Sequence, residues 1–149
     1  MAAIAPRAFP RVGMLNGFCF GMTRQVIDAI GDFDEEAFPD GYGEEQDYCL
    51  RAVQAGFDLA IADHAYVYHA GTRSYDPAKR EKLKRAGRAA QLRKHKSSRI
   101  RAAISSTYQE PTLHLMRETL AALLLAGPPT GSLGNSGAPI ATGEIRSPA

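Results

Sequence analysis

The sequence predicts an α/β chain in three parts, and three observations carry this prediction. In the first half, apolar residues follow a strand pattern, then two helical patterns, then two short extended patterns. Lys and Arg number 5 against 12 Asp and Glu in residues 1–76, but 11 against 1 in residues 77–101. From position 127 onward, 12 of 23 residues are Gly, Pro or Ser. We therefore expect an acidic α/β module at 1–76, a basic helical extension at 77–126 and a disordered tail at 127–149.

The acidic module is expected to open with a buried strand at 11–24, where the run RVGMLNGFCFGMTR is apolar with interspersed glycines. A short helix should follow, because Thr23 is a suitable N-cap and Gly31 a suitable stop. The apolar face of this helix consists of Val26, Ile27 and Ile30. The next run, DFDEEAFPDGYG, is rich in turn formers and is expected to be a loop.

A second helix is predicted from Glu44 to Gly56, where apolar residues recur at helical spacing and a glycine ends the run. Its expected buried stripe consists of Tyr48, Cys49, Ala52 and Val53. Two short extended segments, FDLAIAD and AYVYHAG, complete the module. The two cysteines, Cys19 and Cys49, form no Cys-x-x-Cys motif and both lie in apolar runs, so we expect buried free thiols.

The extension is predicted to be helical. Pro77 starts the run PAKREKLKRAGRAAQLRKHK, since proline suits a first helical turn. The apolar stripe of this helix is thin, so most of its surface should face solvent; the stripe consists of Leu83, Ala86 and Ala90. A second amphipathic helix, at about 111–126, should dock on another part of the chain. Its wider stripe consists of Leu113, Met116, Leu120, Leu123 and Leu124.

Two segments bear on location. The first ten residues lack the basic start and the long apolar run of a secretory signal. The longest apolar run, LAALLLAG at 120–127, is shorter than the roughly 18 residues that cross a bilayer. We therefore expect a cytoplasmic chain, either free or peripheral at the inner face of the membrane.

The run GYGEEQDYCLRA at 41–52 concentrates acidic residues directly after a Gly-Tyr-Gly turn. Carboxylates in a first helical turn accept hydrogen bonds from unpaired backbone N–H groups and are stabilised by the helix dipole. The same position fixes a carboxylate where a substrate can reach it, and a neighbouring acid can raise its pKa. A helix cap and a catalytic site are both open at this point.

A longer run containing these acids resembles the acceptor-side half of family 2 glycosyltransferases with the GT-A fold. The run is NGFCFGMTRQVIDAIGDFDEEAFPDGYGEEQDYCLRAVQAGFDLAIADHAYVYHAG, and the resemblance covers about residues 12–75. The motifs occur in the family's order: a Gly-rich strand ending in Arg, IGDFDE, an aromatic-Gly-acid-acid turn, Asp-aromatic-Cys-x-Arg, a Gly-aromatic helix stop, and a strand ending in Tyr-x-His.

The resemblance implies an inverting transferase in which Glu45 is the general base that deprotonates an acceptor hydroxyl. The family usually has Glu-Asp at this turn, whereas this chain has Glu-Glu, so Glu44 is the alternative base. The resemblance also places Asn16 and Gly17 beside the substrate. Asp47 either supports the acid turn, paired with the Arg four positions later, or contacts the acceptor.

The resemblance further implies that His69 helps to hold a divalent metal, Mn or Mg, which neutralises the leaving diphosphate. A structural histidine is the alternative, and His64 is interpreted as structural because an extended segment points it to the other face. Asp32 and Asp34 form an Asp-x-Asp run, but it follows a helix rather than a strand. We interpret that run as a structural loop near the acceptor entrance.

The implied substrates are a nucleotide sugar and a saccharide or lipid-linked acceptor. The family's nucleotide-binding half would precede residue 12, so we expect a truncated or split transferase whose metal is held jointly with that half. The alternative function is a non-catalytic basic module that meets an anionic membrane surface or nucleic acid through residues 79–101. That segment lacks interleaved aromatic residues, so we expect weak peripheral membrane contact and no specific nucleic acid.

Overall fold

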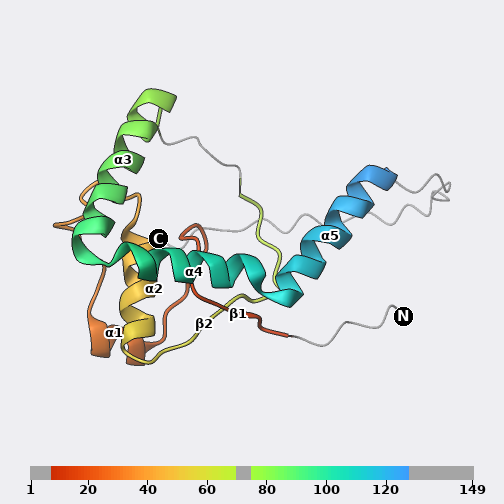
Figure 1. Cartoon of the computed structure of the whole chain (residues 1–149), viewed down its shortest axis with the longest axis horizontal. Coiled ribbons are helices and arrows are strands. Elements are labelled where there is room, and N and C mark those ends of the chain that lie inside the picture. Colours follow the sequence, from red (N-terminus) through yellow and green to blue (C-terminus); the bar gives the residue numbers. More distant parts are fainter. Residues whose placement is uncertain (1–7, 70–74, 128–149) are drawn as a thin grey trace, which may run out of the picture.

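The computed structural model describes residues 8–69 and 75–127 of the chain, and it contains both helices and strands, as predicted (Figure 1). Two short strands pair antiparallel, with Arg11 opposite Ala60 and Val12 opposite Leu59. The elements in chain order are β1 (Arg11–Val12), α1 (Arg24–Ile30), α2 (Glu44–Gln54), β2 (Leu59–Ala60), α3 (Pro77–Lys94), α4 (Ser97–Gln109) and α5 (Pro111–Ala126).

Helix α4 runs through the middle of the molecule, and the other elements are arranged around it (Figure 1). Helices α3 and α5 leave from its two ends, α2 lies beneath the end where α3 joins, and β1 contacts α4. Helix α2 contacts α1, α3 and β2, so it is the central support of the acidic module. None of the helices in the described ranges combines the length and the apolarity that crossing a membrane requires.

The hydrophobic core lies where α2, the small sheet and the start of α5 meet. Its buried members are Val12, Cys49, Ala52, Leu59 and Leu113. The predicted buried stripe of α2 is confirmed for Tyr48, Cys49 and Ala52, but it is wrong for Val53, which is 46% exposed. Cys49 is fully buried, whereas Cys19 is exposed, which corrects the expectation that both thiols are buried.

The predicted strand at 11–24 is wrong beyond its first two residues. After Val12, the backbone of Met14 hydrogen-bonds the side chain of Thr107 on α4 through both its N–H (3.0 Å) and its C=O (3.3 Å). A side-chain partner takes the place of a neighbouring strand, so no ladder continues. Of the two extended segments expected after α2, the described residues contribute only Leu59–Ala60 to a strand, and Tyr66 in the second segment is 90% exposed.

Local capping signals are confirmed by the structure. The side chain of Thr23 accepts a hydrogen bond from the backbone of α1, and Gly31 ends that helix with a φ of 72°. Gly56 follows α2 with a φ of 87°. Pro77 lies in the first turn of α3, where Asp76 is the N-cap.

The basic segment at 77–101 is divided between two helices, α3 and the start of α4. Its continuous helix ends at Lys94, because His95 adopts extended backbone angles (φ −128°, ψ 144°), and α4, which the sequence analysis did not predict, follows. The predicted stripe of α3 is correct for Leu83 and Ala90, whereas Ala86 is exposed. On α5 only Leu113 is buried, so that helix docks through its first turn alone. The predicted disordered tail lies outside the described residues from 128 onward.

Candidate active site

The acid turn has an unusual backbone. Gly41, Tyr42 and Gly43 have φ values of 78°, 64° and 128°, so three consecutive residues lie in the left-handed region. Glycine adopts this region freely, but a tyrosine does so at a cost that the surrounding structure must offset. The turn brings the chain sharply into α2, whose first two residues are Glu44 and Glu45.

Glu45 lies between the acid turn and the Asn16–Gly17 segment. Its Oε2 accepts a hydrogen bond from the N–H of Gly43 at 3.3 Å. A Cβ added to Gly17 would lie 3.1 Å from Cβ and Cγ of Glu45, so only a glycine fits comfortably there. Burial raises the pKa of Glu45, and the neighbouring charge of Glu44 raises it further against two backbone hydrogen bonds that lower it.

Glu44 points to a different part of the turn. A Cβ added to Gly41 would lie 3.4 Å from Oε1 of Glu44, and its Oε2 is buried with no hydrogen-bond partner among the residues that the structure describes. The two adjacent carboxylates therefore differ in environment. Glu45 is hydrogen-bonded and lies against Gly17, whereas Glu44 folds back on the turn.

Both glutamates line an open cavity of about 720 Å³. This cavity, called the acid cavity below, brings together the predicted residues Asn16, Gly17, Glu44 and Glu45. Residues of helices α3 and α4 also line it. The remaining lining residues are Asp40, Gly41, Tyr42, Gly43, Gln46, Tyr75, Lys84, Arg88, Gln91, Ile100 and Ile104.

Asp47 is fully buried beneath the acid turn, so a direct contact with an acceptor does not fit its position. One oxygen, Oδ1, lies 2.7 Å from Nε2 of His95 and 2.9 Å from Nζ of Lys94. The other, Oδ2, accepts from Nε of Arg51 at 2.9 Å. Burial alone acts to raise the pKa of Asp47, but the hydrogen bonds from His95, Lys94 and Arg51 outweigh it and hold that pKa below its usual value.

The loop after α1 is tied to the same network. Arg51 donates from Nη2 to the carbonyl oxygen of Asp32 at 2.8 Å and from Nη1 to that of Ile30 at 2.6 Å. Asp34 accepts from the N–H of Ala37 at 2.9 Å and contacts the ammonium group of Lys94. These contacts are those of a structural loop, and neither aspartate lines the acid cavity.

His69 is not among the residues that line the acid cavity, so the structure does not bring it together with Glu45. Its ring stacks on Phe18 with the ring centroids 4.5 Å apart. Within residues 8–69 and 75–127, no group of three or more His, Cys, Asp or Glu side chains could hold a metal ion. The implied divalent metal, held jointly with a nucleotide-binding half, stays a prediction. His64 lies beside Asp63 and Phe9, in the position of a structural histidine.

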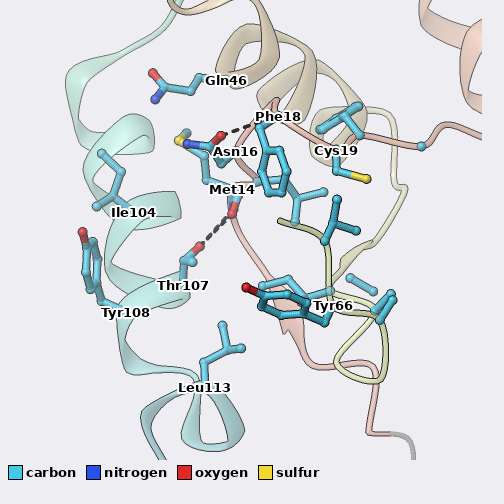
Figure 2. A pocket seen from close by; sticks show the side chains of 18 of the residues that line it. Met14, Asn16, Phe18, Cys19, Gln46, Tyr66, Ile104, Thr107, Tyr108 and Leu113 are labelled. Atoms are coloured by element: carbon cyan, nitrogen blue, oxygen red, sulfur yellow. Dashed lines mark hydrogen bonds between the residues drawn. The ribbon is translucent and has the colours of Figure 1, made fainter. Parts of the chain in front are cut away.

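A second, larger cavity of about 1020 Å³ adjoins the acid cavity, and the two share Asn16, Gln46 and Ile104 (Figure 2). Thr107 and Tyr108 of α4 line one side of it, and Phe18, Cys19 and Tyr66 approach from segments far away in the sequence (Figure 2). The sequence alone did not indicate this cavity, because no helix was predicted at 97–109 and because the segments that line the cavity are not adjacent in the chain.

No protein-family model matches the chain, and no solved structure matches it. Three uncharacterized proteins resemble it, one from Mycobacterium bovis and two from strains of Mycobacterium tuberculosis. Each is 34% identical over 71 residues, which are 46% of this chain and 27% of the relative. The match thus spans about a quarter of the length of these relatives.

The sequence pattern did not indicate the α3 residues of the acid cavity either, because a basic run with a thin apolar stripe is typical of a solvated helix surface. One signal could have revealed them. Gly87 interrupts an otherwise strong helix pattern, and an interior helix glycine often marks a close packing contact. Lys84, Arg88 and Gln91 lie three, one and four positions from it, on or beside the same helix face.

Proposed function

We propose that the acid cavity is the acceptor and general-base part of an inverting glycosyl-transfer site, with Glu45 as the base. The observation that carries this proposal is the environment of Glu45: a partly buried carboxylate with a raised pKa on the wall of an open cavity. A general base works best when its pKa approaches the working pH, and burial next to a second acid is a common way to achieve that. The resemblance to family 2 glycosyltransferases supports the same assignment.

In the proposed reaction, an acceptor hydroxyl enters the acid cavity and gives its proton to the carboxylate of Glu45. The hydroxyl oxygen forms a bond to the anomeric carbon of a nucleotide sugar as the bond from that carbon to the diphosphate oxygen breaks. The electron pair leaves with the nucleoside diphosphate, and the configuration at the anomeric carbon inverts. Asn16 and Gly17 lie beside Glu45 and would orient the hydroxyl and leave room for it.

The other acids have different parts in this proposal. Glu44 keeps the pKa of Glu45 raised through its charge. Asp47 contacts no substrate in this proposal. It stabilises the first turn of α2 through its buried contact with His95. No group of three or more ligands in residues 8–69 and 75–127 could hold a metal ion alone, so a divalent metal, Mn or Mg, enters the proposal as one held jointly with the nucleotide-binding half. A nucleotide-binding half, in the same or another chain, belongs to the proposal, as does action at or near the cytoplasmic face of a membrane.

A transfer assay tests the proposal. The protein, together with the proposed nucleotide-binding half, is incubated with uridine, guanosine and thymidine diphosphate sugars and a mixture of saccharide and lipid-linked acceptors. We expect release of nucleoside diphosphate that depends on the acceptor, and a product of inverted anomeric configuration by NMR. Release without acceptor dependence with every donor, or a retained configuration, would contradict the proposed reaction.

A further inference from the structure

Helix α3 packs against the acid turn backbone to backbone. A Cβ added to Gly87 would lie 1.5 Å from the carbonyl oxygen of Tyr42, so no side chain fits at that position without a shift of the backbone. The buried residues Leu83, Ala90 and Gln91 lie on the same face, one turn to either side. The apolar stripe of the basic helix is thus used for contact with the acid turn.

Gln91 is the polar contact at the centre of this interface, and it is only 6% exposed. Its Nε2 donates to the carbonyl oxygen of Gly43 at 3.2 Å and also contacts Oε1 of Gln46. The same carbonyl accepts the N–H of Asp47 at 2.9 Å, which is the first backbone hydrogen bond of α2. Gln91 thus holds the residue at which the helix begins.

Gly43 also connects Gln91 to Glu45. While its carbonyl accepts from Gln91, its N–H donates to Oε2 of Glu45. Gly43 has a φ of 128°, and a Cβ added there would lie 2.8 Å from Nε2 of Gln91, so the contact leaves no space for a side chain. Gln91 thus binds the C=O of the residue whose N–H donates to Glu45, and only the φ and ψ rotations of Gly43 separate the two groups.

We propose that Gln91 is a positioning residue for Glu45, acting through the backbone of Gly43. The role in catalysis rests on the proposed function, whereas the coupling between Gln91 and Glu45 does not. The end of α3 supports the arrangement, since Lys94 and His95 bind Asp47 one turn further along α2. The basic extension is on this view a structural part of the site, although composition alone suggests a charged surface.

The test is an NMR titration of the whole chain without substrate. The amide chemical shift of Gly43 should change with pH as the carboxyl group of Glu45 titrates, and Glu45→Gln should abolish that change. Gln91→Met keeps the side-chain volume but removes the donor. In this variant we expect the pH-dependent shift change of the Gly43 amide to be lost and that amide to exchange faster with solvent. Glu44, Asp40, Lys84 and Arg88 line the same cavity and are unchanged in these variants.

Leu92→Met is the matched control, because Leu92 is the next residue of α3 and is 48% exposed. In Leu92→Met the pH-dependent shift change of the Gly43 amide should persist. If Gln91→Met does not fold, Gln91→Asn gives the same measurement, since it keeps the amide but shortens its reach by one methylene. If the Gly43 amide shift still changes by the original amount as Glu45 titrates in either Gln91 variant, Gln91 only fills space and does not position Glu45. The result is independent of sugar transfer, so it does not depend on the proposed function.

Discussion

Glu45 and Asp47 lie two positions apart in the first turn of α2, and their surroundings shift their pKa values in opposite directions. Burial, followed by the charge of Glu44, raises the pKa of Glu45. Asp47 has no exposed surface, whereas Glu45 is half-buried, yet the hydrogen bonds from His95, Lys94 and Arg51 outweigh burial and lower the pKa of Asp47. Neighbouring acids with pKa values pushed apart are a recurring feature of acid–base sites, where one carboxyl group reacts and another stays ionised.

Asp47→Ala should strongly destabilise the fold, because it leaves His95, Lys94 and Arg51 facing a vacated buried position. Removal of one partner from a buried ionic network costs about 3–5 kcal/mol. Urea unfolding at pH 7 measures the loss. The exposed pair of Arg11 and Asp58 provides the control, since Asp58→Ala should cost no more than about 1 kcal/mol.

The same aspartate predicts an acid limb in the stability profile. The folded-state pKa of Asp47 is lowered, so its contribution is fully present above its ordinary pKa of about 3.9 and is lost as the pH falls through the folded value. Urea unfolding between pH 7 and about pH 2 should therefore show a fall in stability below about pH 4. That fall should be smaller in Asp47→Ala. Equal acid limbs in the two proteins would show that Asp47 does not have the lowered pKa.

Glu45→Gln should have the opposite effect and stabilise the fold at neutral pH. A raised folded-state pKa means that the folded protein bears a cost when the carboxylate is charged, and this cost disappears as the pH falls below the ordinary value of about 4.3. We expect a gain of about 0.5–2 kcal/mol at pH 7, the usual range for a single stabilising substitution. Urea unfolding measures it, and the exposed Glu36→Gln should be neutral. A destabilised Glu45→Gln would indicate that the helix-cap role dominates.

Gly87→Ala tests the contact between α3 and the acid turn. In an ordinary helix this substitution gains about 1 kcal/mol from helix propensity. Here the added Cβ would meet the carbonyl oxygen of Tyr42, so we expect a net loss of about 1–3 kcal/mol from overpacking. Thermal or urea unfolding shows the sign. Gly21→Ala is the control, because no atom lies within 4 Å of its added Cβ and the change should be within about 0.5 kcal/mol.

Part of this structure could be predicted from local sequence, and the reasons are specific. Thr23 and Gly31 bound α1, and Pro77 starts α3, because capping and turn chemistry depend only on neighbouring residues. The acid turn likewise lies directly before α2, where the contiguous run GYGEEQDY placed it, whereas the substrate roles of Glu45 and Gly17 stay a prediction.

The incorrect predictions involve partners that lie far away in the chain. The strand at 11–24 ends because Met14 bonds Thr107, which is 93 positions later. The basic helix ends at His95, whose ring bonds Asp47, 48 positions earlier. Gln91 and Gly43 are likewise 48 positions apart, so Gly87 could indicate that α3 makes a close contact but not that its partner is the acid turn.

The most direct measurement compares the turnover of Glu45→Gln and Glu44→Gln, each together with the proposed nucleotide-binding half, under the assay that detects sugar transfer. If Glu45 is the general base, Glu45→Gln should lower turnover by about 10²- to 10⁴-fold, the usual contribution of general-base catalysis, while the protein stays folded. Glu44→Gln should cost much less, because Glu44 only adjusts the pKa of its neighbour. If the two variants are equally active, Glu45 is a helix-capping residue and the account of the acid cavity as a catalytic site is wrong.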